Sequence, residues 1–297
     1  MRGISLLPIL STSIWGISIV AGKILGTNGL NPLEITFFRF TVASICFVPI
    51  LFHIHFVGRE PFPKKDTWKS LFGLSITGVA LNNVIFYLGL EQTDASVASL
   101  LVGLNPLVTM LFAVWMVGER LTIRKLISVI IGLFGVFLIV GNDLTPGRFG
   151  GNLLIILAAS IWAASFSFTK IASRSGLSSI SITGWSIILG TFILLPFQIA
   201  GGNFSFEYSS ETIYWLGFMG VVSSVFAYIV HYKAIEIFGP SRVAPSTNII
   251  PLSGALASFF ILHEKLSPLV LIGGALIVIG VITAQLEKTG IKQEDLS

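Results

Sequence analysis

Polar and aromatic side chains interrupt the long apolar stretches of this chain at a few positions, and these residues have the means to bind a small molecule. Amides donate and accept hydrogen bonds, and tyrosine and tryptophan add a ring face with one donor. A polar side chain in an apolar segment is costly unless it meets a cavity or a partner, so such positions are functional candidates. The candidate binding residues are Trp15, Asn82, Asn83, Asn105, Trp162, Tyr228 and Asn248. Simple packing remains the alternative for the two tryptophans, and interfacial anchoring for Tyr228.

Two prolines, Pro106 and Pro251, stand inside apolar stretches at equivalent positions of an internal repeat described below. A proline inside a helix removes one hydrogen bond, which here frees the carbonyls of Val102 and Thr247. Freed backbone groups are tolerated at membrane depth where they line a wet cavity or bond a neighbour. The prolines therefore predict helix breaks beside a cavity, and a kink that only improves packing is the alternative.

Residues that could perform covalent chemistry are not arranged for it. The sequence contains neither a Gly-x-Ser-x-Gly nucleophile motif nor a His-Glu-x-x-His metal motif. The four histidines, His53, His55, His231 and His263, are not spaced as one site. We therefore expect no catalytic residue, no metal and no cofactor, and an intramembrane enzyme or a passive scaffold is the less favoured interpretation.

The segments that must position the candidate residues are membrane helices. Apolar residues make up 54% of the chain, only 11% are charged, and the mean hydropathy is +0.90, whereas a soluble domain is about 25% charged. A bilayer core requires about 20 apolar residues per helix. Ten stretches meet this length: 4–23, 33–54, 69–90, 95–117, 122–140, 151–172, 180–200, 212–235, 241–262 and 268–286. The fold class is thus an all-α integral membrane protein with ten transmembrane helices.

The lysines and arginines set the orientation by the positive-inside rule. With the N-terminus in the cytoplasm, thirteen of them fall on the inner side and only Lys23, Arg148 and Lys265 on the outer side. We expect a multi-pass protein of the inner (cell) membrane with both termini cytoplasmic. The net charge of +4 then reflects attraction to the inner leaflet, and no nucleic acid is required as a partner.

The chain is a tandem duplication. Ser13-Ile14-Trp15 recurs 147 positions later as Ser160-Ile161-Trp162, and at an offset of 145 Pro106 and Glu119 recur as Pro251 and Glu264. Each copy holds five stretches, an odd number, so the second copy must enter the membrane from the opposite side. Inverted repeats are a known transporter design with the site near the midplane. The expected division is repeat one at 1–141, a connecting loop at 142–150, repeat two at 151–286 and a cytoplasmic tail at 287–297.

The same residues resemble a known family. The Trp15 to Lys23 pattern, the stretch from Pro32-Leu33-Glu34 to Phe38-Arg39, Asn105-Pro106, and Gly118-Glu119-Arg120-Leu121 are similar to the EamA-type repeat of the drug/metabolite transporter superfamily. The second copy keeps Trp162, Pro251 and His263-Glu264-Lys265-Leu266 but has Ile250 in place of the asparagine and Trp185 near the place of Arg39. The resemblance covers about residues 4–286.

The resemblance implies a ten-helix transporter, often an exporter of amino acids or related small metabolites. It also implies that the first, third and fourth helices and their copies surround the cavity. Small multidrug pumps, which resemble this family distantly, need a glutamate in the first helix for proton exchange, and neither the first nor the sixth stretch has an acid. We expect export by alternating access, with an importer or exchanger of another small organic solute as the alternative, acting as a monomer or homodimer.

A few remaining residues carry structural expectations. Arg39 and Lys23 lie near enough to the outer face to extend their charges to the interface, and a direct role in binding is the less favoured alternative. The repeated glutamates, Glu264 among them, are expected to make helix-end contacts. The glycines of 122–140 and 268–286 predict close helix packing inside one chain, with a dimer contact as the alternative.

Overall fold

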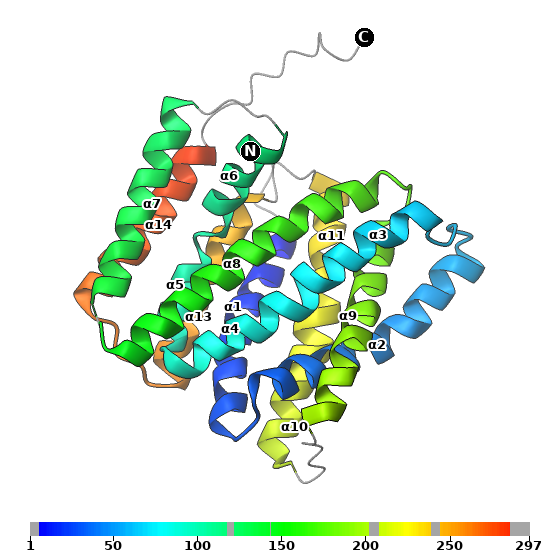
Figure 1. Cartoon of the computed structure of the whole chain (residues 1–297), viewed down its shortest axis with the longest axis horizontal. Coiled ribbons are helices and arrows are strands. Elements are labelled where there is room, and N and C mark those ends of the chain that lie inside the picture. Colours follow the sequence, from blue (N-terminus) through cyan, green and yellow to red (C-terminus); the bar gives the residue numbers. More distant parts are fainter. Residues whose placement is uncertain (1–5, 118–121, 143, 202–207, 239–243, 286–297) are drawn as a thin grey trace.

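The computed structural model describes residues 6–117, 122–142, 144–201, 208–238 and 244–285 (Figure 1). Within these ranges every regular element is a helix and no strand occurs. The predicted tail and the motif Gly118-Glu119-Arg120-Leu121 lie outside the described residues. The all-helical prediction is confirmed for the part of the chain that is described.

The first half of the chain forms five helical segments, three of which consist of more than one element. They are α1 (Leu6–Thr27), α2 (Pro32–Phe52) with η1 (His53–Val57), α3 (Lys65–Leu74) with η2 (Ser75–Ala80) and α4 (Leu81–Gln92), α5 (Ala95–Val102) followed by α6 (Asn105–Val117), and α7 (Ile123–Gly141). A capping box starts α2: Asn31 accepts from the Glu34 N–H, and the Glu34 carboxylate accepts from the Asn31 N–H. This satisfies two donors that a helix start leaves open.

The second half repeats this order. Its segments are α8 (Pro146–Ser173), α9 (Ser179–Gly201), α10 (Ser210–Gly217) with η3 (Phe218–Phe226) and α11 (Ala227–Phe238), η4 (Ala244–Asn248) followed by α13 (Ile249–Ile261), and α14 (Pro268–Gln285). The segments η2 and η3 are both π-helical and stand at matching places in the two copies. Such wider turns often occur at functional sites.

Six of these helical segments are long and apolar enough to cross a membrane, by length and composition. They are Leu6–Thr27, Pro32–Val57, Lys65–Gln92, Pro146–Ser173, Ser179–Gly201 and Ser210–His231. Four shorter apolar helices, Ala95–Leu111, Leu126–Gly141, Ser246–Ile261 and Pro268–Thr283, complete the described chain. The fold is therefore that of a multi-pass membrane protein.

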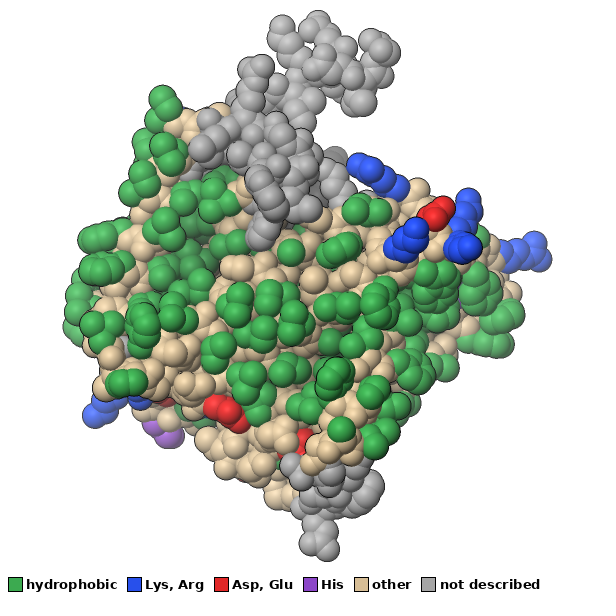
Figure 2. Space-filling model, viewed as in Figure 1, with side chains coloured by type: hydrophobic (Ala, Val, Ile, Leu, Met, Phe, Trp, Pro, Cys, Tyr) green, Lys and Arg blue, Asp and Glu red, His purple; other side chains and the backbone are tan. Residues whose placement is uncertain are grey.

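The outer surface is apolar over most of the face seen in Figure 2, and the charged side chains gather at the ends of the molecule. Large hydrophobic side chains such as Ile45 (67% exposed), Phe137 (67%) and Phe192 (65%) point outward. A soluble protein rarely exposes so extensive an apolar surface. Lipid is the solvent that suits these side chains.

Glycines bring helices into backbone contact inside the molecule. A Cβ on Gly135 of α7 would lie 2.5 Å from the Gly273 carbonyl oxygen of α14, and a Cβ on Gly16 of α1 would lie 2.7 Å from the Ile250 carbonyl oxygen. Helices α7 and α14 run side by side along one edge of the molecule (Figure 1). The predicted internal packing of the α7 and α14 glycines is therefore confirmed.

Candidate functional site

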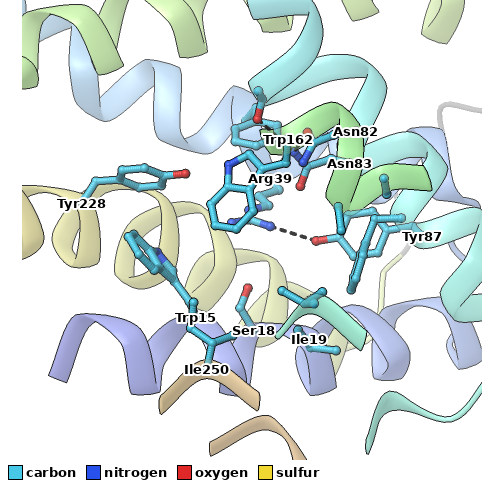
Figure 3. A pocket seen from close by; sticks show the side chains of 16 residues that line it. Trp15, Ser18, Ile19, Arg39, Asn82, Asn83, Tyr87, Trp162, Tyr228 and Ile250 are labelled. Carbon is cyan, nitrogen blue, oxygen red and sulfur yellow. Dashed lines mark hydrogen bonds between the residues drawn. The ribbon is translucent and has the colours of Figure 1, made fainter. Parts of the chain in front are cut away.

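A cavity with about 760 Å³ of empty space lies between the two halves of the chain (Figure 3). Its walls come from α1, α2, η2, α4 and α5 of the first half and from α8, α11 and α13 of the second. The lining residues are Trp15, Ser18, Ile19, Arg39, Phe40, Gly78, Asn82, Asn83, Phe86, Tyr87, Val102, Ala158, Ala159, Trp162, Tyr228 and Ile250.

Five of the residues that the sequence singled out as binding candidates line this one cavity. They are Trp15, Asn82, Asn83, Trp162 and Tyr228. They come from four different helices, and only the fold brings them together. Their contact with a substrate remains a prediction.

Trp15 forms an aromatic wall with residues of α11. Its ring lies 5.0 Å from Tyr228 and 4.9 Å from His231, measured between ring centroids, with tilted planes. Its indole N–H donates to the Ser223 carbonyl oxygen of η3 at 3.1 Å. Because this bond fixes the ring, the face of Trp15 is held toward the cavity while its polar atom is satisfied by backbone.

Asn82 and Asn83 supply unused amide groups at the cavity wall. The Asn83 amide nitrogen donates to the Val79 carbonyl oxygen at 2.9 Å and to the Asn82 side-chain oxygen at 2.7 Å. A carbonyl acceptor fixes which atom of Asn83 is the nitrogen, and this in turn orients Asn82. The Asn83 oxygen and the Asn82 nitrogen therefore have no partner among the described residues and can serve as an acceptor and a donor for a bound molecule.

The two predicted helix-break prolines stand next to matching discontinuities. Helix α5 ends at Val102, Gly103 and Leu104 form a tight turn, and Pro106 is the second residue of α6. Pro251 is the third residue of α13, which follows the 3-10 turn η4. Backbone N–H groups in the first turn of a helix have no intrahelical acceptor, so a proline at these positions costs no hydrogen bond. Val102 and Ile250, which flank these breaks, both line the cavity.

Asn105 and Asn248 lie outside the lining. Asn105 is buried (5% exposed), its amide nitrogen donates to the Ala159 carbonyl oxygen at 3.1 Å, and its oxygen accepts from Thr109 at 3.2 Å. Because Ala159 lines the cavity, Asn105 supports the wall that α8 provides. Asn248 ends η4 and precedes α13, and its side chain makes no capping hydrogen bond there.

Arg39 lines the cavity, although the sequence interpretation favoured a place at the outer interface for its charge. Its guanidinium donates from Nε to the Ser224 hydroxyl at 2.7 Å, from Nη1 to the Tyr87 hydroxyl at 2.8 Å and from Nη2 to the Ser223 hydroxyl at 3.4 Å. The residue is only 9% exposed. The expectation that Arg39 extends to the outer interface was therefore wrong. Its partners on η3 are far away in sequence, so no local pattern could have shown them.

Glu264 makes the helix-end contact that was expected of it, and Lys23 also contacts a helix end. The Lys23 ammonium donates to the carbonyl oxygens of Leu90 and Thr93, each at 2.7 Å, at the end of α4. The Glu264 carboxylate accepts from the backbone N–H groups of Ala95 and Ser96 at 2.9 Å, at the start of α5. A cation at a helix C-terminus and an anion at an N-terminus both oppose the helix dipole. Neither residue lines the central cavity.

A second, smaller pocket of about 380 Å³ lies beyond Tyr87. Its lining includes Gly22, Lys23 and Glu91, and Tyr87 belongs to both pockets. The Tyr87 ring packs against α1, where a Cβ on Gly22 would lie 2.5 Å from the ring. The Tyr87 side chain is thus the wall between the central cavity and the pocket at the Lys23 end of α1.

A helical multi-pass membrane protein with a polar cavity between two similarly ordered halves has the architecture of a membrane carrier. The EamA-like transporter family model matches residues 1–141 and again residues 149–284. The chain belongs to this family of membrane transporters.

Known transporters of similar length are related to the chain over most of their sequences. The chain is 30% identical over 284 residues to an uncharacterized transporter of Archaeoglobus fulgidus, covering 93% of this chain and 95% of that protein. It is 25% identical over 288 residues to a probable amino-acid metabolite efflux pump of Escherichia coli, covering 92% of each. A solved crystal structure with 20% identity superposes with a TM-score of 0.61 over 95% of this chain and 96% of the other, which supports the fold.

Proposed function

We propose that this protein is an alternating-access exporter of amino acids or related small metabolites in the inner membrane. It consists of ten spans in two inverted repeats, residues 1–141 and 151–286, joined by the loop at 142–150. The observation that carries the proposal is the cavity of about 760 Å³ to which both halves contribute polar and aromatic side chains. A small zwitterion or organic acid suits this mixed polar and aromatic lining.

The packing of the helices supports two repeats related by a twofold axis. The two halves correspond in order, from α1 and α8 at their starts to α7 and α14 at their ends. With a twofold axis, each contact between an element of one half and an element of the other should have a matching contact between their counterparts. Helix α2 packs on η3, and its counterpart α9 packs on η2. Helix α1 packs on α13, and its counterpart α8 packs on α5 and α6. Helix α4 packs on α8, and its counterpart α11 packs on α1. Helices α2 and α9, and α7 and α14, pair with their own copies. Two such similar halves can exchange conformations, which opens one face while closing the other.

The contacts between helix ends support the assignment of sides. At the end predicted to be cytoplasmic, the Glu60 carboxylate accepts from the Ser178 N–H at 3.0 Å, and His55 Nε2 accepts from the Trp185 indole N–H at 3.0 Å. At the end predicted to be external, Arg148 pairs with Asp94. Loops assigned to one side by their charges thus meet one another.

The export direction and the amino-acid class are inferred from the family resemblance and from the Escherichia coli relative, a probable amino-acid metabolite efflux pump. They are tested by measuring amino acids in the medium of cells that overproduce the chain and of cells that lack it. Extracellular accumulation of one amino acid that follows expression supports export. Net uptake of that compound would overturn the direction and establish the importer alternative.

Variants link the transport to the cavity. Trp162→Ala removes a ring from the lining, and Asn105→Ala removes the support of Ala159, so both are expected to reduce the export rate at normal membrane abundance. Leu157→Ala on the same helix is the control, because Leu157 is 48% exposed on the outer surface and absent from the lining. Wild-type rates in both cavity variants would refute the assignment of the cavity.

A further inference from the structure

The central cavity contains an unbalanced positive charge. Arg39 is the one ionisable acid or base among the described residues that line it, if the tyrosine phenols are set aside. No carboxylate among the described residues lies within ion-pair distance of its guanidinium, which is bonded only to the hydroxyls of Ser223, Ser224 and Tyr87. A buried charge without a counter-charge is costly. The empty cavity is therefore electrostatically suited to an anion.

The guanidinium retains donors for that anion. It carries five N–H groups in a planar fork, and its three hydrogen bonds use one on Nε and one on each terminal nitrogen. One N–H on Nη1 and one on Nη2 remain without a partner among the described residues. These two N–H groups can donate to the oxygens of a carboxylate.

A second buried group points to the same ligand. Ser18 lines the cavity, is 5% exposed, and its hydroxyl has no hydrogen-bond partner among the described residues. Figure 3 shows the Ser18 hydroxyl pointing from α1 into the cavity, on the side of the Arg39–Tyr87 hydrogen bond. A buried hydroxyl without a partner is rare in a folded protein and is explained when a ligand supplies the partner.

We propose that Arg39 and Ser18 form a binding site for a single carboxylate of the transported solute. This rests on the proposed function and narrows its substrate class to monocarboxylates, such as amino acids with uncharged side chains. One guanidinium pairs with one carboxylate, so a second carboxylate would find no cation in the described lining, and a cationic drug would place its charge against that of Arg39. The free Asn83 oxygen and the faces of Trp15 and Trp162 are suited to an ammonium group and an apolar side chain on the same solute.

The test measures head-group preference with probes that share one tail. Hexanoate, hexanamide and hexylamine are titrated into the protein in nanodiscs, with empty nanodiscs as the blank, and binding is followed by tryptophan fluorescence. We expect hexanoate to bind at least about tenfold more tightly than either of the others, as for a charge-assisted contact. Equal binding of hexanoate and hexanamide to the wild-type protein would overturn the proposal, and this measurement requires no variant.

Variants assign the preference to Arg39. Arg39→Gln is expected to abolish the preference for hexanoate, and Arg39→Lys to keep a preference that is smaller than that of the wild type, because lysine retains the charge but not the fork. Arg174→Gln, an exposed arginine at the end of α8, is the matched control. An Arg39→Gln protein that still prefers hexanoate would overturn the proposal. If Arg39→Gln fails to fold, Ser18→Ala serves instead, with an expected loss of hexanoate affinity and unchanged hexanamide affinity.

The two proposals can fail separately. Absence of any exported amino acid together with a hexanoate preference would reject the proposed export and retain the carboxylate site. Export of an amino acid together with equal affinity for its carboxamide would reject the carboxylate site alone.

Discussion

Removal of the Glu264 carboxylate should destabilise the start of α5, the short helix whose other end borders the cavity. Glu264 comes from the second half of the chain, yet it accepts from the Ala95 and Ser96 N–H groups at 2.9 Å and from the Ser96 hydroxyl at 2.6 Å. These groups open α5, which has only 8 residues. A helix this short is marginal without outside contacts. Glu264 is thus a cap supplied to one half of the molecule by the other.

The loss in free energy of unfolding can be estimated from the hydrogen-bond donors that the substitution leaves unpaired. Glu264→Ala removes the charged acceptor of two backbone donors and its interaction with the helix dipole, worth roughly 3 kcal/mol if water could not replace it. Because Glu264 is only partly buried, we expect about 2 kcal/mol, and about half of that for Glu264→Gln, whose one oxygen still accepts. For a chain of this size 2 kcal/mol corresponds to a fall in Tm of about 4 °C.

The assay is thermal unfolding of the purified protein at one fixed heating rate, since membrane proteins often unfold irreversibly. Lys265→Ala is the control, because Lys265 is the exposed neighbour of Glu264. A Tm within about 1 °C of wild type for Glu264→Ala, with the same precision for the control, would refute the capping argument.

Three further substitutions test packing and helix ends by the same thermal assay. Gly135→Ala should lower Tm by several degrees, since its Cβ would lie 2.5 Å from the Gly273 carbonyl oxygen, whereas Gly26→Ala, with open space around it, should not. His263→Gly should raise Tm by about 1–2 °C, because His263 has a left-handed backbone (φ 54°) that glycine adopts without strain. Lys23→Met should lower Tm by about 2–4 °C, since the carbonyls that end α4 lose their donor.

The positions of the helices could be predicted from apolar stretches, but their interruptions could not. The stretch predicted at 95–117 is two helices, α5 and α6, because Gly103 and Leu104 turn the chain before Pro106. The proline indicated a disturbance near this point. Whether it becomes a kink or a complete break depends on packing against other parts of the chain, such as the contact of Gly103 with Pro251 and Ile277.

The candidate site, too, could be predicted only in part from the sequence. Trp15, Asn82 and Trp162 could be found because polar groups at depth must meet a cavity or a partner, and they line the cavity. The same rule selected Asn105, whose partner is a backbone carbonyl of α8. The sequence shows that a buried amide must have a hydrogen-bond partner. It cannot show whether that partner is a ligand in the cavity or a backbone carbonyl of another helix.

The charge state of the Arg39 surroundings depends on which groups bind its guanidinium, and burial alone does not decide it. A carboxylate beside Arg39 would neutralise it permanently and leave nothing for a ligand to balance. Hydroxyls position the guanidinium without adding charge: the Ser224 hydroxyl donates its own proton to the Met219 carbonyl oxygen at 2.8 Å, so it can only accept from Arg39. The cation is therefore held in place by neutral groups while its charge remains unbalanced. In the proposed site the counter-charge enters with the substrate, and serine at positions 223 and 224 holds the guanidinium without neutralising it.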